Sequence, residues 1–144
     1  SFEYSIDVEE VADDILIPKL ILLPIVENAF KYAFDKMPPW KLSIKVRLIN
    51  NNWTVAIQDN GGCLSNERKE YLMNTFKNID INEESKSLKI GGMGLKNVYL
   101  RLKLLYGQQS IFEIENTLPQ RTIFTLGGPI YKSKEEYYEH NPKL

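Results

Sequence analysis

The sequence has little cysteine and histidine, and it has no long apolar run. It holds one cysteine, Cys63, and one histidine, His140, among 144 residues. A single cysteine excludes an internal disulfide and fits a reducing compartment. Because Cys63 has no cysteine or histidine partner at ligand spacing, we expect no zinc site. No apolar run approaches the roughly 20 residues that a membrane helix needs.

The sequence also lacks an excess of charge of either sign. Its formal net charge is −1, so nothing in its electrostatics favours binding to nucleic acid or to an anionic membrane. A hydrophobic content of 43% with 26% charged residues is ordinary for a globular protein. A chain of this length is enough for one domain with its own core.

Hydrophobic periodicity predicts five strands and three main helices. The first strand should be half-buried, because its apolar residues alternate with polar ones. Helices packed on one face of a mixed sheet account for the order of elements, which gives an α+β fold. A polar loop is expected over 78–89 and a polar tail from 129, with a short helix in it. The predicted strands cover 2–8, 42–48, 53–57, 111–115 and 122–126, and the predicted helices cover 24–35, 67–76 and 95–106.

A segment that opens with Pro24 places polar side chains among apolar ones. Proline suits the first turn of a helix because it has no N–H to leave unpaired. On such a helix Asn28, Lys31 and Tyr32 share one face, with Glu27 at its border. An amide oxygen can bind a hard cation and an ammonium can bind phosphate, so this face suits a metal-bound polyphosphate. The residues alone also fit an ordinary amphipathic helix with a solvated face.

Two glycine-rich segments follow this helix in the sequence. Asp59-Asn60-Gly61-Gly62 comes directly after a predicted strand, and Gly91-Gly92-Met93-Gly94 opens the last main helix. Glycine lets a backbone approach a ligand closely, and N–H groups at a helix start favour an anion. The same residues are common in turns and hinges, so neither segment alone specifies a site.

In order and spacing, the three segments together resemble the ATP-binding domain of sensor histidine kinases of the LytS/YesM type. The asparagine box of that group reads roughly Gln-Pro-Leu-Val-Glu-Asn-Ala, and residues 23–29 read Leu-Pro-Ile-Val-Glu-Asn-Ala. Its glycine box ends Gly-Leu-x-Asn-Val-x-x-Arg-Leu, which residues 94–102 match. The resemblance implies the two-layer α/β sandwich of the GHKL ATPases (gyrase, Hsp90, histidine kinase, MutL), with residues 1–128 as the domain and 129–144 as the tail.

The resemblance also implies ATP and Mg²⁺ as ligands and gives each box a role. Asn28 would bind the magnesium ion, and Glu27 would be the catalytic acid–base residue. Lys31 would contact phosphate, and Tyr32 would lie along the nucleotide. Asp59 would accept a hydrogen bond from the amino group of adenine. The other cofactor-binding positions would be Gly61, Gly92, Gly94, Leu95 and Thr122.

A kinase of this type donates the γ-phosphoryl group of ATP to a histidine on a separate dimerisation domain. No such histidine motif occurs in this sequence, because His140 lies at the wrong end. We therefore expect this chain to bind Mg-ATP but not to complete autophosphorylation alone. The resemblance implies a homodimeric, membrane-anchored bacterial parent, with this domain in the cytoplasm and a response-regulator receiver domain as a further partner. The net charge of −1 gives no reason to expect a nucleic-acid partner.

Two departures from the family pattern leave alternatives open. Cys63 stands where the family has the second glycine of Asp-x-Gly-x-Gly, and Arg121 replaces the glycine that usually precedes Thr122. A degenerate GHKL module with weak or no nucleotide binding would explain both changes. A GHKL ATP hydrolase of the gyrase or MutL kind would keep the Glu27-Asn28 box but activate water. For Thr122, an ordinary β-branched strand residue is as good a reading as a contact near the base.

Overall fold

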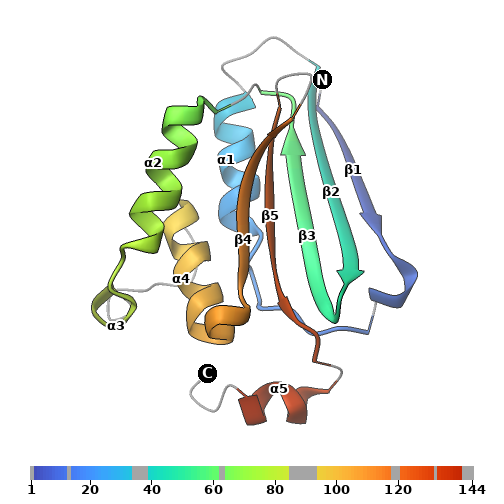
Figure 1. Cartoon of the computed structure of the whole chain (residues 1–144). Helices are drawn as coiled ribbons and strands as arrows, with labels where there is room; N and C mark the ends of the chain where they lie inside the picture. Colours follow the sequence, from blue (N-terminus) through green and yellow to red (C-terminus); the bar gives the residue numbers. More distant parts are fainter. Residues whose placement is uncertain are drawn as a thin grey trace.

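The protein forms two layers, a five-stranded mixed sheet and a set of helices on one of its faces (Figure 1). The computed structural model describes residues 2–12, 14–33, 39–61, 64–84, 94–117, 121–131 and 133–140. The strand order is β1-β2-β3-β5-β4, and β1 pairs parallel with β2 whereas the other neighbours are antiparallel. The predicted fold class is confirmed. The strands are β1 (Phe2–Val8), β2 (Trp40–Ile49), β3 (Asn52–Asp59), β4 (Ile111–Thr117) and β5 (Arg121–Pro129).

The helices follow the predicted order, and their ends agree with the local sequence. Ser65 caps α2, because its side-chain oxygen accepts a hydrogen bond from the Arg68 backbone N–H at 3.1 Å. The helix α4 ends at Tyr106, directly before Gly107. The described part of the first helix begins one residue before Pro24. The helices are α1 (Leu23–Ala33), α2 (Asn66–Lys77), α3 (Ile81–Glu84), α4 (Gly94–Tyr106) and α5 (Lys134–His140), with short 3-10 turns at Glu10–Ala12 and Gly107–Gln109.

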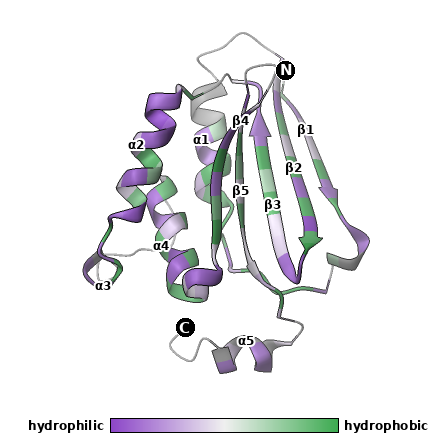
Figure 2. Ribbon diagram, viewed as in Figure 1, coloured by the Kyte–Doolittle hydropathy of each residue, from purple (hydrophilic) through white to green (hydrophobic). Residues whose placement is uncertain are grey.

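Strands β2 and β3 form an antiparallel hairpin. Asn50 and Asn51 both have positive φ, 50° and 63°, which is the conformation of a two-residue turn that matches strand twist. Hydrophobic and hydrophilic residues alternate along β2 (Figure 2), and buried residues alternate with half-buried ones along β3. The hydrophobic set of β3 faces the helices and is buried.

The core lies between the helices and the centre of the sheet, around Trp53 of β3. Trp53 is fully buried and meets the ring of Tyr106 edge-on, with 6.1 Å between ring centroids. Gly128 of β5 makes this contact possible. A Cβ atom at that position would lie 2.6 Å from the Tyr106 ring, so a larger residue would force the ring away. Tyr131 stacks on the other side of this cluster, 6.1 Å from Tyr106, so packing onto the core continues past the end of β5.

The expectation of a half-buried first strand is wrong. Every residue of β1 is exposed, including Tyr4 at 70% and Ile6 at 60%. Tyr4 and Ile6 pair with Leu42 and Ile44, so they point to the same face of the sheet as the core. The helices pack on β3, β5 and β4, and none of the described helices lies over the β1 edge (Figure 1). The apolar side chains of this strand are therefore exposed in the described part of the structure.

The expectation of a loop over 78–89 is also incomplete. One helical turn, α3, forms inside it. The Asp80 carboxylate accepts hydrogen bonds from the backbone N–H groups of Asn82 and Glu83, at 3.0 and 3.3 Å, which caps this turn. The short helix expected in the tail is present as α5. None of the helices in the described ranges has the length and apolar character that crossing a membrane requires.

Candidate functional site

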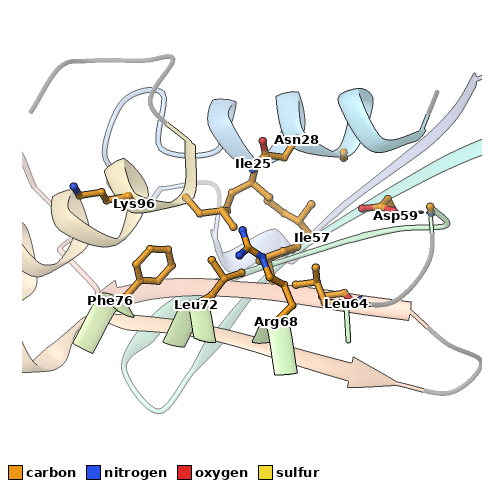
Figure 3. A pocket seen from close by; sticks show the side chains of 14 residues that line it. Ile25, Asn28, Ile57, Asp59, Leu64, Arg68, Leu72, Phe76 and Lys96 are labelled. Atoms are coloured by element: carbon orange, nitrogen blue, oxygen red, sulfur yellow. Dashed lines mark hydrogen bonds between the residues drawn. The ribbon is translucent and has the colours of Figure 1, made fainter. Parts of the chain in front are cut away.

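A cavity of about 470 Å³ opens between α1, α2 and the start of α4, with β3 and β5 as its floor (Figure 3). Most of its wall is apolar, and a small set of polar groups is spread along it. This composition is typical of a site for a ligand with an apolar ring and a polar chain. The cavity is lined by Ile25, Asn28, Ala29, Ile57, Asp59, Gly61, Leu64, Arg68, Leu72, Phe76, Leu95, Lys96, Thr122 and Phe124.

Asp59 lies at one end of the cavity, where β3 ends. One of its carboxylate oxygens accepts a hydrogen bond from the Gly61 backbone N–H at 2.6 Å, which fixes the turn. Burial raises the pKa of Asp59 above its ordinary value, while the Gly61 N–H and the positive charge of Arg121 partly oppose that rise. The result is a partly desolvated acceptor at the cavity wall, suited to an amino group.

Helix α1 forms the wall that carries the predicted asparagine box. Ile25, Asn28 and Ala29 share one helix face and all line the cavity. Glu27 is exposed and is not among the lining residues. The backbone of Lys31 and Tyr32 belongs to α1, but their side chains lie outside the described part of the structure.

The start of α4 brings part of the predicted glycine box to the same cavity. Gly94 begins the helix with φ +72°, a backbone conformation that favours glycine. The next two residues, Leu95 and Lys96, line the cavity. Gly92 lies outside the described residues, as does Cys63 in the earlier glycine-rich segment. The sequence therefore predicted the cavity's contacts with α1, the end of β3 and the start of α4.

Thr122 reaches the cavity from β5 and is buried there. Its hydroxyl accepts a hydrogen bond from the Leu64 backbone N–H at 2.8 Å and donates one to the Asn116 side-chain oxygen at 3.0 Å. The Asn116 amide donates in turn to the Leu64 carbonyl at 2.8 Å. This network ties the segment that leads into α2 to the β4–β5 hairpin. Asn116 has no signal in the sequence, because a polar residue near a strand end is common.

Helix α2 supplies the wall that the motifs do not predict. Arg68, Leu72 and Phe76 follow one another at four-residue spacing and line the cavity together. The four-residue spacing is visible in the sequence and shows that the three residues share a helix face. It does not predict what that face contacts. Phe76 is also part of the core, stacked 5.2 Å from Tyr99.

Comparison with known proteins identifies this arrangement. Residues 13–131 match the family described as histidine kinase-, DNA gyrase B-, and HSP90-like ATPases. The chain belongs to that family. This domain is 31% identical over 138 residues to the sensor histidine kinase/phosphatase LytS of Staphylococcus aureus, an alignment that covers 94% of this chain. It spans only 22% of the length of LytS.

Solved structures of histidine kinases share the fold. The mycobacterial sensor histidine kinase MprB superposes with a TM-score of 0.58 at 14% identity, covering 92% of this chain and 84% of that one. The histidine kinase ThkA, in complex with the response regulator protein TrrA, gives 0.53 at 18% identity, covering 93% and 34%. Together with the family match, these findings make the chain an ATP-binding domain of the histidine-kinase type.

Proposed function

We propose that this domain binds Mg-ATP and donates its γ-phosphoryl group to a histidine on a dimerisation domain of the same parent protein. The observation that carries this proposal is one cavity that joins Asp59, Asn28 and Leu95 in the first turn of α4, three residues that are far apart in the sequence. Asp59 would accept the amino group of adenine, which guanine cannot offer at that position. Apolar side chains beside it, such as Ile57 and Leu64, would hold the ring.

The described residues fit a magnesium ion that arrives with the nucleotide. In the described part of the chain, no three or more His, Cys, Asp or Glu side chains are grouped so that they could hold a metal ion without other ligands. Magnesium usually takes few protein ligands and several phosphate and water oxygens. The Asn28 side chain, on the cavity wall, would supply one amide oxygen. The ion would neutralise charge on the phosphates during transfer.

Glu27 is proposed as the acid–base residue for the transfer. It is exposed beside Asn28 in α1, and its position outside the cavity lining leaves it open to an acceptor brought from another domain. A carboxylate there would orient the acceptor imidazole and hold its proton, while positioning and charge stabilisation supply most of the catalysis. Lys31, Tyr32 and Gly92 stay proposed contacts of the nucleotide.

The parent protein is proposed to act in two-component signalling. LytS is named a sensor histidine kinase/phosphatase, and ThkA has been solved with a response regulator protein. By this analogy the partners are the histidine-bearing dimerisation domain, a second copy of the parent and a receiver domain. A membrane-anchored parent with this domain on the cytoplasmic side belongs to the same proposal.

A calorimetric titration of the domain with ATP and MgCl2 tests the proposal. The affinity is compared with that for GTP and with that for ATP without magnesium. We expect micromolar-range binding of ATP, weaker binding without magnesium, and little binding of GTP. Absence of heat and of thermal stabilisation at millimolar ATP would leave the degenerate module as the better account. Steady release of phosphate from ATP by the domain alone would favour the hydrolase.

A further inference from the structure

The cavity wall opposite α1 carries a cation that none of the three boxes contains. Arg68 lies in the first turn of α2, four residues before Leu72 and eight before Phe76. All three residues line the cavity. The face that α2 turns to the cavity is thus apolar along most of its length and positively charged at its N-terminal end.

The side chain of Arg68 is directed at the ligand space. Figure 3 shows its guanidinium pointing into the middle of the cavity, toward the α1 wall that carries Asn28. Lys96 also lines the cavity, but its ammonium points away from the centre in the same view. With Asp59, these are the charged residues of the described lining. Arg68 is therefore the cation that faces the centre of the described cavity.

The positive charge of Arg68 is not neutralised by a neighbour in the described part of the chain. The ion pairs found there are Glu3 with Lys41 and Asp7 with Arg47, both on the far edge of the sheet. The guanidinium carbon of Arg68 lies 5.2 Å from the ring centroid of Tyr71, one turn along the helix. An exposed contact of this kind is weak, so it can orient the guanidinium without competing with an anion.

We infer that Arg68 binds the phosphate chain of the nucleotide from the α2 side. The inference rests on the proposed function, in which Asp59 holds adenine at one end of the cavity and Asn28 meets the metal-bound phosphates. A chain that runs from Asp59 toward Asn28 passes the space into which the guanidinium points. Guanidinium presents paired N–H donors that match phosphate oxygens, and charge-assisted hydrogen bonds of this kind are strong.

The test compares ATP, ADP, AMP and adenosine binding to the wild-type domain and to Arg68→Met, with magnesium present. Methionine keeps the unbranched apolar stem and removes the charge. We expect ATP affinity to fall about 10-fold to 100-fold, as for loss of a hydrogen bond to a charged group. Adenosine affinity should change by less than about twofold, and Arg68→Lys should restore part of the ATP affinity.

Lys69→Met is the matched control, because Lys69 is the adjacent cation of α2 and does not line the cavity. It should bind all four ligands as the wild type does, and both variants should keep the wild-type unfolding temperature.

Equal losses of ATP and adenosine binding in Arg68→Met would mean a contact with the base or sugar and would overturn the assignment, as would unchanged binding. If the wild-type domain binds adenosine, and the phosphates add nothing to its affinity, the inference about Arg68 fails but the proposed function does not. If it binds none of the ligands, the proposed function fails with it.

Discussion

At the scale of single residues, Asp59 shows how a carboxylate in a cavity wall can lower the stability of the empty protein. Its pKa is raised mainly because its carboxylate is partly removed from water, so the ionised form is less favourable in the folded chain than in the unfolded one. Such a group lowers the free energy of unfolding at pH values above its folded pKa. The penalty disappears as pH falls toward the ordinary value of 3.8.

Asp59→Asn separates stability from binding. The amide keeps an oxygen that can accept the Gly61 N–H, and it removes the desolvated charge. Differential scanning calorimetry at neutral pH should therefore find the empty variant at least as stable as the wild type. Calorimetric titration should find ATP affinity about 10-fold lower or worse, because a charged acceptor is lost. A variant that is clearly less stable and binds normally would show that Asp59 is structural.

Asp59 also predicts that ligand affinity depends on pH. Adenosine is the ligand for this test, because it has no phosphate groups that titrate. Protonated Asp59 is a weaker acceptor, so adenosine affinity of the wild type should fall as pH drops through the folded pKa, at a pH above 3.8. Equilibrium dialysis over the range in which the domain stays folded measures this midpoint. Asp59→Asn should give a flat profile, and an equally steep profile in that variant would assign the titration to another group.

Single-residue roles could be read from the sequence only where a motif carried them. Asn28, Asp59 and Leu95 were predicted and line one cavity. Arg68 was not predicted, because an arginine near a helix start is common and its surroundings come from segments distant in the chain. Glu27, predicted from the same box as Asn28, lies outside the described lining, since adjacent helix residues point in different directions.

At the scale of elements, the β4–β5 hairpin holds the entrance to α2 through side chains. Thr122 and Asn116 together hydrogen-bond both backbone groups of Leu64, a residue of the cavity wall. The wall next to Asp59 is thus set by two side chains of a neighbouring hairpin.

Asn116→Ala should loosen that wall. Removing the amide deletes the hydrogen bond that Asn116 donates to the Leu64 carbonyl and the one that it accepts from the Thr122 hydroxyl, at a cost of about 1 kcal/mol in stability. We expect ATP affinity to fall about threefold to tenfold by calorimetric titration. Asn74→Ala is a suitable control, because Asn74 is an exposed asparagine of α2 away from this network. Equal effects of the two changes would argue against an anchoring role.

Elements were the most predictable level. The periodicity of apolar residues predicted the five strands of the sheet and the three main helices. The turn at α3 was missed because its periodicity is too short to read, although Asp80 is a good cap. For β1, alternation predicted the strand correctly but did not predict that its side chains are exposed. A pattern of period two says which residues share a face, and only the tertiary arrangement decides whether a helix covers it.

At the scale of the whole molecule, the helix layer is narrower than the sheet. The helices lie over β3, β5 and β4, while the apolar side of β1 extends beyond them (Figure 1). Phe2, Tyr4, Ile6 and Val8 are 40% to 70% exposed on that side. An apolar edge strand with a free side favours self-association of a chain in water.

Tyr4→Thr combined with Ile6→Thr should reduce self-association and leave the site intact. Threonine keeps β propensity and removes apolar surface that is already exposed, so stability should change by less than about 1 kcal/mol. Sedimentation at high protein concentration measures the association, and ATP titration measures the site. Ser5→Thr, on the opposite face of the same strand, is the control. A large loss of stability in the double variant would contradict the exposed position of the row.

The cavity wall joins residues from Ile25 of α1 to Phe124 of β5, and every layer of the domain contributes to it. A molecule that touches all of these segments acts on the chain as a removable cross-link, because the unfolded chain offers no such site. A ligand present at 100 times its dissociation constant stabilises the folded state by about 2.7 kcal/mol. Inside a cell the survival of this domain against proteases would then rise and fall with the supply of its nucleotide, independently of any signal it transmits.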